Sequence, residues 1–153
     1  MNKRVLVVDD HAPTVDLISD ALGTEGFSVL RAGNGAECLM KVYRESPDLL
    51  ILDVAMPVMD GLEALRSLRE AMETAHLPVI VLSGRGEFDD VLTGWQLGAN
   101  LYLVKPVKIG AVIAAVKWLL GAPVSQQAQQ AISEAKIPGA PARSPRAVVA
   151  CDW

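Results

Sequence analysis

The sequence predicts an α/β fold built on a doubly wound, five-stranded parallel β-sheet with helices on both faces. Five short apolar runs alternate with five helix-like segments up to Gly121 of the 153-residue chain. This alternation indicates parallel strands, because each helix returns the chain to the end of the sheet where the next strand starts. Four of the five runs also end at acidic, hydroxyl or basic side chains, which a parallel sheet brings to one edge.

The first two strands are predicted over residues 5–8 and 27–30. The helix between them begins near Pro13, which suits a first helical turn because its missing N–H has no partner there. Apolar residues at helical spacing continue to Leu22, and Gly23 ends the helix.

The third strand is predicted over residues 49–52 and reaches Asp53. It is a continuous apolar run, which is typical of a parallel strand buried on both faces. The helix before it is predicted between Gly35 and Pro47. Asp60 is predicted to cap the helix after it, because an Asp side chain accepts hydrogen bonds from the first turn.

The fourth and fifth strands are predicted over residues 78–82 and 101–104, and they end at Ser83 and Lys105. A helix is expected after each of them, and each helix is closed by a glycine. These helices are predicted at about residues 87–97 and 108–120.

The composition changes after Gly121, and residues 122–153 are predicted to form a flexible tail rich in Ala, Pro and Gln. A marginal helix is expected near residues 125–136, whereas residues 137–153 lack apolar periodicity. The tail is too short for a winged-helix or other folded DNA-binding domain of the usual size.

The chain carries a net charge of −4, and 51% of its residues are hydrophobic. The acidic balance argues against direct nucleic-acid binding through phosphates. No apolar stretch approaches the roughly 18–20 residues of a membrane span, so no membrane insertion is expected. The N-terminal apolar run is short and ends at two acids, which argues against a signal peptide. Cys38 and Cys151 lie far apart, so we expect reduced thiols and a cytoplasmic location.

The polar residues at the strand ends form a candidate site, because all carboxyl ends of parallel strands lie at one edge. They are Asp9, Asp10, Asp53, Ser83 and Lys105. Three carboxylates in one pocket repel each other unless a cation lies among them, and oxygen ligands with room for water favour Mg²⁺. A lysine and a hydroxyl opposite them suit a transferred phosphoryl group. A carboxylate in this setting can act as the nucleophile and form an acyl phosphate.

These motifs resemble the response-regulator receiver domain of two-component signalling. The matching motifs are Asp9-Asp10, Asp53-x-x-Met56-Pro57-x-x-Asp60-Gly61, Ser83-Gly84 and Gly98-Ala99-x-x-Tyr102-Leu103-x-Lys105-Pro106. The resemblance covers about residues 3–121, and we assign residues 1–121 to the receiver domain. It implies a flavodoxin-like (βα)5 fold with strand order 2-1-3-4-5.

The resemblance also implies roles for the site residues. Asp53 would accept the phosphoryl group. Mg²⁺ would be held by Asp9, Asp10, Asp53 and the backbone carbonyl of Ala55, directly by Asp10 and partly through water by Asp9. Lys105 would form an ion pair with the phosphorylated Asp53.

The remaining motif residues would sense the phosphoryl group. Ser83 would move toward its oxygens, and Tyr102 would turn inward when Ser83 moves. The Lys105–Pro106 bond would be cis, which is plausible because its second residue is proline. Ala55 and Arg85 occupy positions that tune phosphoryl lifetime in this family, and Ala55 has no polar side chain to orient a water.

The resemblance makes a histidine kinase or a histidine phosphotransfer protein the expected phosphoryl donor. The output is expected to be a protein–protein contact with a downstream target, through the face of the fourth helix, fifth strand and fifth helix. Trp95 and Trp118 lie in the segments that form this face, where exposed aromatics would enlarge it. A homodimer through the same face is a further expectation.

Three alternatives remain open at this point. The first is a binding-only adaptor with the receiver fold and no chemistry. The second is an aspartyl-phosphate hydrolase of the dehalogenase type, which resembles a pattern with a second Asp at the position of Ala55. The third is that residues 122–153 are a linker within a longer regulator.

Overall fold

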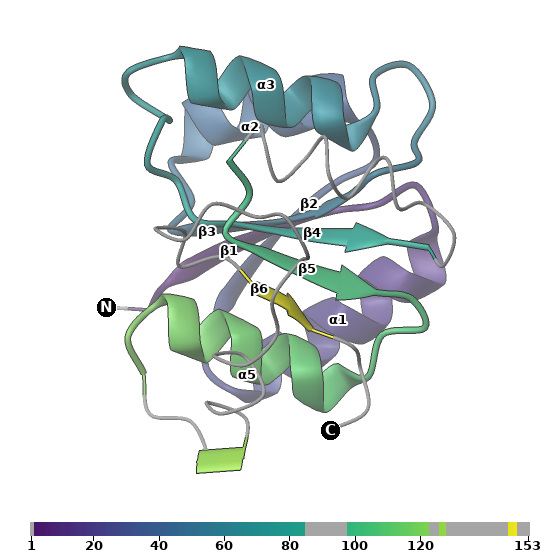
Figure 1. The fold of residues 1–153 in the computed structure, drawn as a ribbon, viewed down its shortest axis with the longest axis vertical. Coiled ribbons are helices and arrows are strands. Elements are labelled where there is room, and N and C mark those ends of the chain that lie inside the picture. The colour runs from purple at the N-terminus through teal and green to yellow at the C-terminus, as the bar shows by residue number, and fades with distance from the viewer. Residues whose placement is uncertain (1, 85–97, 123–125, 128–146, 150–153) are drawn as a thin grey trace.

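The computed structural model describes residues 2–84, 98–122, 126–127 and 147–149. It contains a parallel sheet with strand order β2-β1-β3-β4-β5-β6 and helices on both faces (Figure 1). The strands are β1 (Arg4–Val8), β2 (Ser28–Ala32), β3 (Leu49–Asp53), β4 (Val79–Ser83), β5 (Leu101–Val104) and β6 (Ala147–Val149). The helices are α1 (Ala12–Thr24), α2 (Gly35–Glu45), α3 (Gly61–Glu70) and α5 (Ile109–Leu119).

The predicted order of the first five strands, 2-1-3-4-5, is confirmed. The structure adds a short sixth strand, β6, beside β5, within the segment that was predicted to be a flexible tail. A three-residue strand is too short to show the alternation by which strands are recognised in a sequence. The helix predicted over residues 87–97 and most of the one near 125–136 lie outside the described residues.

The sheet separates two apolar layers. One layer lies between the sheet and the pair α1 and α5, and the other lies between the sheet and the pair α2 and α3. Successive residues of β1 alternate between the layers, with Val5 and Val7 in the first and Leu6 and Val8 in the second. Burying each such side chain stabilises the fold by about 1.5–3 kcal/mol. The sheet is therefore held from both faces, and its strand ends are rigid supports.

Side-chain caps fix where α2 and α3 begin. The Asp60 carboxylate accepts a hydrogen bond from the Glu63 N–H at 2.9 Å, as predicted. The Asn34 side chain accepts from the Glu37 N–H at 2.9 Å, a cap that the sequence analysis treated only as a turn. Each cap satisfies one free N–H of a first turn, which contributes about 1 kcal/mol.

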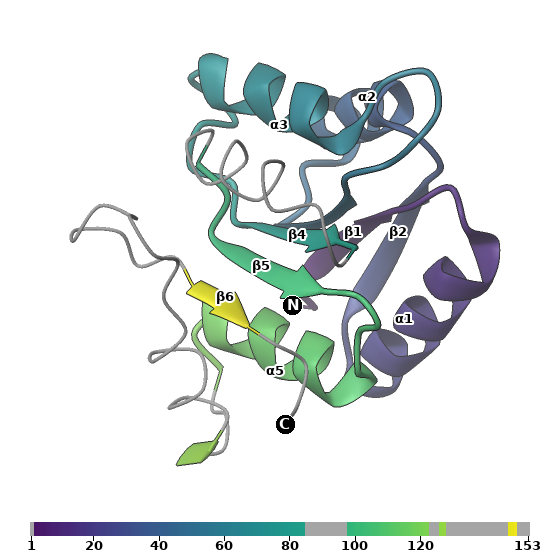
Figure 2. The same cartoon turned by 45° about the vertical axis from the view of Figure 1, so that its right-hand side comes forward.

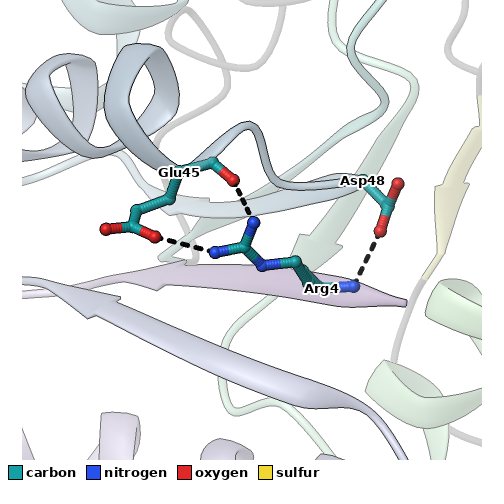
Figure 3. A network of polar contacts seen from close by, with 3 residues as sticks. All are labelled: Arg4, Glu45 and Asp48. Atoms are coloured by element: carbon teal, nitrogen blue, oxygen red, sulfur yellow. Dashed lines mark hydrogen bonds and ion pairs between the residues drawn. The ribbon is translucent and has the colours of Figure 1, made fainter. Parts of the chain in front are cut away.

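Arg4 ties the start of β1 to the connection between α2 and β3 (Figure 3). Its guanidinium donates to the backbone carbonyl of Glu45 and, at 2.8 Å, to the Glu45 carboxylate. Its backbone N–H donates to Asp48 Oδ2 at 2.8 Å. Because the Arg4 and Glu45 side chains are partly exposed, we expect this cluster to fix geometry more than to add stability.

Cys38 lies in the apolar layer under α2 and is fully buried, as a small core residue. Burial raises the pKa of its thiol to about 12, so the thiol is protonated at neutral pH. None of the helices within the described ranges is long and apolar enough to cross a membrane.

Gly61 allows the first turn of α3 to pack directly against the end of β3. A Cβ at this position would lie 2.1 Å from the backbone oxygen of Asp53. The Gly61 N–H donates to the backbone oxygen of Val54 at 2.9 Å, which locks the approach. The loop from Asp53 to Asp60 is therefore held at both ends.

We expect Gly61→Ala to lower the free energy of unfolding by roughly 3 kcal/mol or more, because backbone must move to admit the new methyl group. Gly110→Ala is the matched control, since Gly110 lies in α5 and a Cβ there meets nothing within 4 Å. That change should be neutral or stabilise by up to about 1 kcal/mol. Urea unfolding of both variants tests this, and equal stabilities would contradict it.

Candidate functional site

The carboxyl ends of four neighbouring strands bring the predicted site residues to one edge of the sheet. Asp53 is the last residue of β3, and Ser83 is the last residue of β4. Asp9 directly follows β1, and Lys105 directly follows β5. The register pairs Asp53 with Leu82 and Ser83 with Val104, so these ends lie level with one another.

Three carboxylates gather at this edge. One carboxylate oxygen from each of Asp9, Asp10 and Asp53 lies within 4.8 Å of the other two. Asp9 and Asp53 are each only 3% exposed, whereas Asp10 is exposed. The cluster therefore has a buried side and a side that faces solvent.

Lys105 provides the positive charge at the cluster. Its Nζ lies 2.7 Å from Asp53 Oδ1 and 3.8 Å from Asp9 Oδ2. The first distance is that of a charge-assisted hydrogen bond, and the second is a weaker ion pair. Lys105 thus favours Asp53 over Asp9.

The pKa of Asp53 is raised above its ordinary value, chiefly because burial removes water from the carboxylate. The hydrogen bond and the charge of Lys105 act in the opposite direction, and the charges of Asp9 and Asp10 raise the pKa further. Burial and carboxylate repulsion therefore outweigh the single lysine.

The donor set fits a hard divalent cation. Asp9 Oδ2 is buried and accepts no hydrogen bond within the part of the chain that the structure describes. Asp9 Oδ1 accepts from the His11 N–H at 3.0 Å, which orients this carboxylate. A cluster of oxygen donors with one exposed side suits Mg²⁺, which binds few carboxylates and keeps several waters.

Ser83 and Tyr102 lie behind the acids, on the adjacent strands β4 and β5. Ser83 is 1% exposed, and among the described residues its Oγ has no hydrogen-bond partner. Tyr102 is fully buried in the apolar layer that contains α2 and α3. The tyrosine side chain thus points inward in this structure.

The other predicted residues are placed as follows. Ala55 lies exposed in the loop after β3, and the Lys105–Pro106 peptide bond is cis. Trp118 lies on α5, where it is partly buried and packs against the core. Arg85 and Trp95 lie outside the described residues.

One feature of the site was missed from the sequence. Val58, in the loop between β3 and α3, has a φ of 69° and is 85% exposed. The Met59 N–H donates to the Pro57 backbone oxygen at 2.8 Å around it. A β-branched residue rarely adopts this conformation, so no residue type in the loop indicated it.

The comparisons with known proteins agree on one family. The family model described as "Response regulator receiver domain" matches residues 5–117. The chain belongs to the response-regulator receiver family. Receiver domains of this family are parts of two-component response regulators.

Curated relatives are similar over the same region. The chain is 39% identical over 120 residues to the alkaline phosphatase synthesis transcriptional regulatory protein PhoP of Bacillus subtilis, covering 78% of this chain and 49% of PhoP. It is 43% identical over 117 residues to the transcriptional regulatory protein PrrA of Mycobacterium tuberculosis, covering 76% of this chain and 49% of PrrA. The chain thus spans about half the length of these relatives.

Solved structures show the same fold. A putative response regulator from Chloroflexus aurantiacus superposes with a TM-score of 0.75 at 32% identity, over 79% of this chain and 99% of that one. The chemotaxis response regulator CheY4 of Vibrio cholerae gives a TM-score of 0.73 at 28% identity, over 78% and 99%. The matched part corresponds to the receiver region.

We expect Asp53→Asn to raise the free energy of unfolding at neutral pH in a Mg²⁺-free buffer. The raised pKa means that the folded state holds the Asp53 charge at a cost, which the amide removes. This gain should be full above the raised pKa and should vanish as pH falls below the ordinary value of 3.8. Urea unfolding in EDTA across this pH range measures it, and a less stable variant at pH 7 would contradict it.

Proposed function

We propose that this chain is a phosphorylation-dependent signalling switch in which Asp53 accepts a phosphoryl group from a histidine kinase or histidine phosphotransfer protein, with Mg²⁺ as cofactor. The observation that carries the proposal is the 2.7 Å contact between Lys105 Nζ and Asp53 Oδ1 beside two further carboxylates. The site thus combines a nucleophile, a fixed cation and an oxygen-only ligand set.

The chemistry is an in-line phosphoryl transfer. A carboxylate oxygen of Asp53 attacks phosphorus, the phosphorus–nitrogen bond to the donor histidine breaks, and the electron pair of that bond leaves with the imidazole. The carboxylates of Asp9, Asp10 and Asp53 and the carbonyl of Ala55 would hold Mg²⁺, which would offset the negative charge on both partners. Lys105 holds Asp53 in place and then pairs with a phosphoryl oxygen.

The signal passes from Asp53 to the adjacent strands. The buried Ser83 Oγ is a hydroxyl donor that a phosphoryl oxygen can engage. Its movement gives Tyr102 a different packing, and the populations of two states of the domain shift. Tyr102 is fully buried in this structure, and we assign this inward position to one of the two states.

The output is a protein–protein contact. PhoP and PrrA are named transcriptional regulatory proteins, and what they share with this chain is the receiver region. We propose a downstream protein target, or a homodimer, at the face of β5, α5 and the fourth helix that the sequence predicts, with no direct nucleic-acid contact. Arg85 and Ala55 set the phosphoryl lifetime. Trp95 and Trp118 contribute to the face, Trp118 through its partly exposed side.

The hydrolase alternative lacks support at the site, because Ala55 occupies the place of the general acid. The binding-only adaptor would need an impaired cluster, and the described acids and Lys105 are close enough to act together.

We expect Mg²⁺ with beryllofluoride to raise the thermal midpoint of the wild type but not of Asp53→Asn. At a concentration 100 times Kd the gain is about 2.7 kcal/mol, or roughly 5–10 °C for a domain of this size. Asp60→Asn is the matched control, since Asn also caps a helix and Asp60 lies outside the acid cluster. Equal shifts in the wild type and Asp53→Asn would contradict the assignment.

Lys105→Met should slow phosphorylation of Asp53 by acetyl phosphate at least about tenfold, because the transferred group loses its fixed positive charge. Lys117→Met is the control. The Lys117 ammonium lies 2.6 Å from the Glu25 carboxylate, in an ion pair between α5 and the end of α1, so its loss should leave the rate unchanged. Phosphoprotein formation followed by mass spectrometry gives both rates. A Lys105→Met rate equal to that of the control would refute the role.

A further inference from the structure

The sixth strand lies on the outer edge of β5, the strand that leads to Lys105 (Figure 2). Its three residues pair in parallel with Leu101, Tyr102 and Leu103. A strand at the edge of a sheet leaves a row of backbone N–H and C=O groups unpaired, and such an edge accepts further strands. We propose that the outer edge of β5 is a strand-accepting surface whose occupant is this chain's own segment 147–149.

The topology indicates that β6 docks onto a finished domain. Helices α1 and α5 lie on the same face of the sheet. However, the step from β1 to β2 and the step from β5 to β6 run in opposite directions across the sheet, toward its two opposite edges. A crossover through α5 would therefore have the opposite hand to the crossover through α1. Crossovers between parallel strands are right-handed in about 98% of cases, so β6 is unlike the strands that fold with their own crossover helix.

The position of β6 couples the tail to the signalling strand. Val148 faces Tyr102 in the register, and Tyr102 is buried beneath that edge. Two residues beyond Leu103, Lys105 contacts Asp53. A partner that offers an extended segment to β5 would have to displace residues 147–149. The pairing at this edge does not depend on phosphorylation.

The backbone geometry identifies which N–H groups form the hydrogen bonds between β5 and β6. The Lys105 N–H donates to the Ser83 backbone oxygen at 2.7 Å, on the β4 side. Because successive N–H groups of a strand point to opposite sides, the N–H groups of Leu101 and Leu103 also point toward β4, and that of Tyr102 points toward β6. In a parallel ladder one residue of each facing pair bonds to the two residues that flank its opposite number. The register therefore expects the Tyr102 N–H to donate to the Ala147 backbone oxygen and the Val149 N–H to donate to the Tyr102 backbone oxygen.

The test compares Val148→Pro with Val149→Pro in the full chain. Proline removes a backbone donor, so Val149→Pro should break the pairing, whereas position 148 points its N–H away from β5 and tolerates proline at a sheet edge. We expect the Tyr102 amide to exchange with solvent at least tenfold faster in Val149→Pro than in the wild type. It should be unchanged in Val148→Pro.

The Leu103 amide, which points toward β4, is the internal control and should keep its protection in both variants. Amide exchange followed by NMR at two protein concentrations reads out all positions. Equal Tyr102 exchange in the wild type and Val149→Pro would overturn the proposal. Tyr102 protection in the wild type that falls on dilution would overturn it too, because the occupant would then be a second copy of the chain.

Discussion

The charge balance of the whole site depends on the contact between the Lys105 ammonium and the Asp53 carboxylate. Three carboxylates at one sheet edge repel each other, and two of them are shielded from water. A single lysine offsets part of this cost at Asp53 and little of it at Asp9, 3.8 Å away. The pKa of Asp53 stays raised, because Lys105 offsets only part of the effect of burial and of the neighbouring carboxylates. Isolated buried charges are costly, so this arrangement depends on a rigid support.

The sheet supplies that support through its strand order. Asp53 and Lys105 end strands that are not neighbours, since β4 lies between β3 and β5. The lysine side chain therefore crosses the end of β4, where Ser83 is the terminal residue. A hydroxyl at this point is next to any group that joins the acid and the lysine. The strand order that makes the ion pair possible therefore also places Ser83 between Asp53 and Lys105.

The sequence was sufficient wherever burial controls the pattern. The strands β1, β3 and β4 are apolar runs because both faces are covered, and they were predicted to within a residue. Strand β2 was expected over residues 27–30 and lies at Ser28–Ala32, because an edge strand is only partly buried and its pattern is weak. The convergence of the acids followed from parallel topology alone. What could not be predicted is which acid takes the lysine, because a difference between 2.7 and 3.8 Å depends on side-chain packing.

Local backbone conformations were the second kind of feature that could not be predicted from the sequence. Val58, at a φ of 69°, lies in the loop after β3, and the close approach of Gly61 to Asp53 occurs where this loop enters α3. Gly35 donates its N–H to the Met59 backbone oxygen at 2.9 Å, so α2 helps to hold this loop. A long-range contact of this kind leaves no periodic signal in the sequence, and it can impose a conformation that the residue itself disfavours.

The unequal burial of Asp9 and Asp10 explains how a cluster of repelling carboxylates can also suit the binding of a cation. Asp9 Oδ2 is buried without a hydrogen bond among the described residues, whereas Asp10 is exposed to water. A cation can approach from the Asp10 side and meet carboxylates that the fold has already desolvated and fixed. It then offsets repulsion that the protein carries in its absence, and little side-chain ordering remains to oppose binding. The charge cost that destabilises the folded domain is therefore the same quantity that favours a divalent ion at this edge.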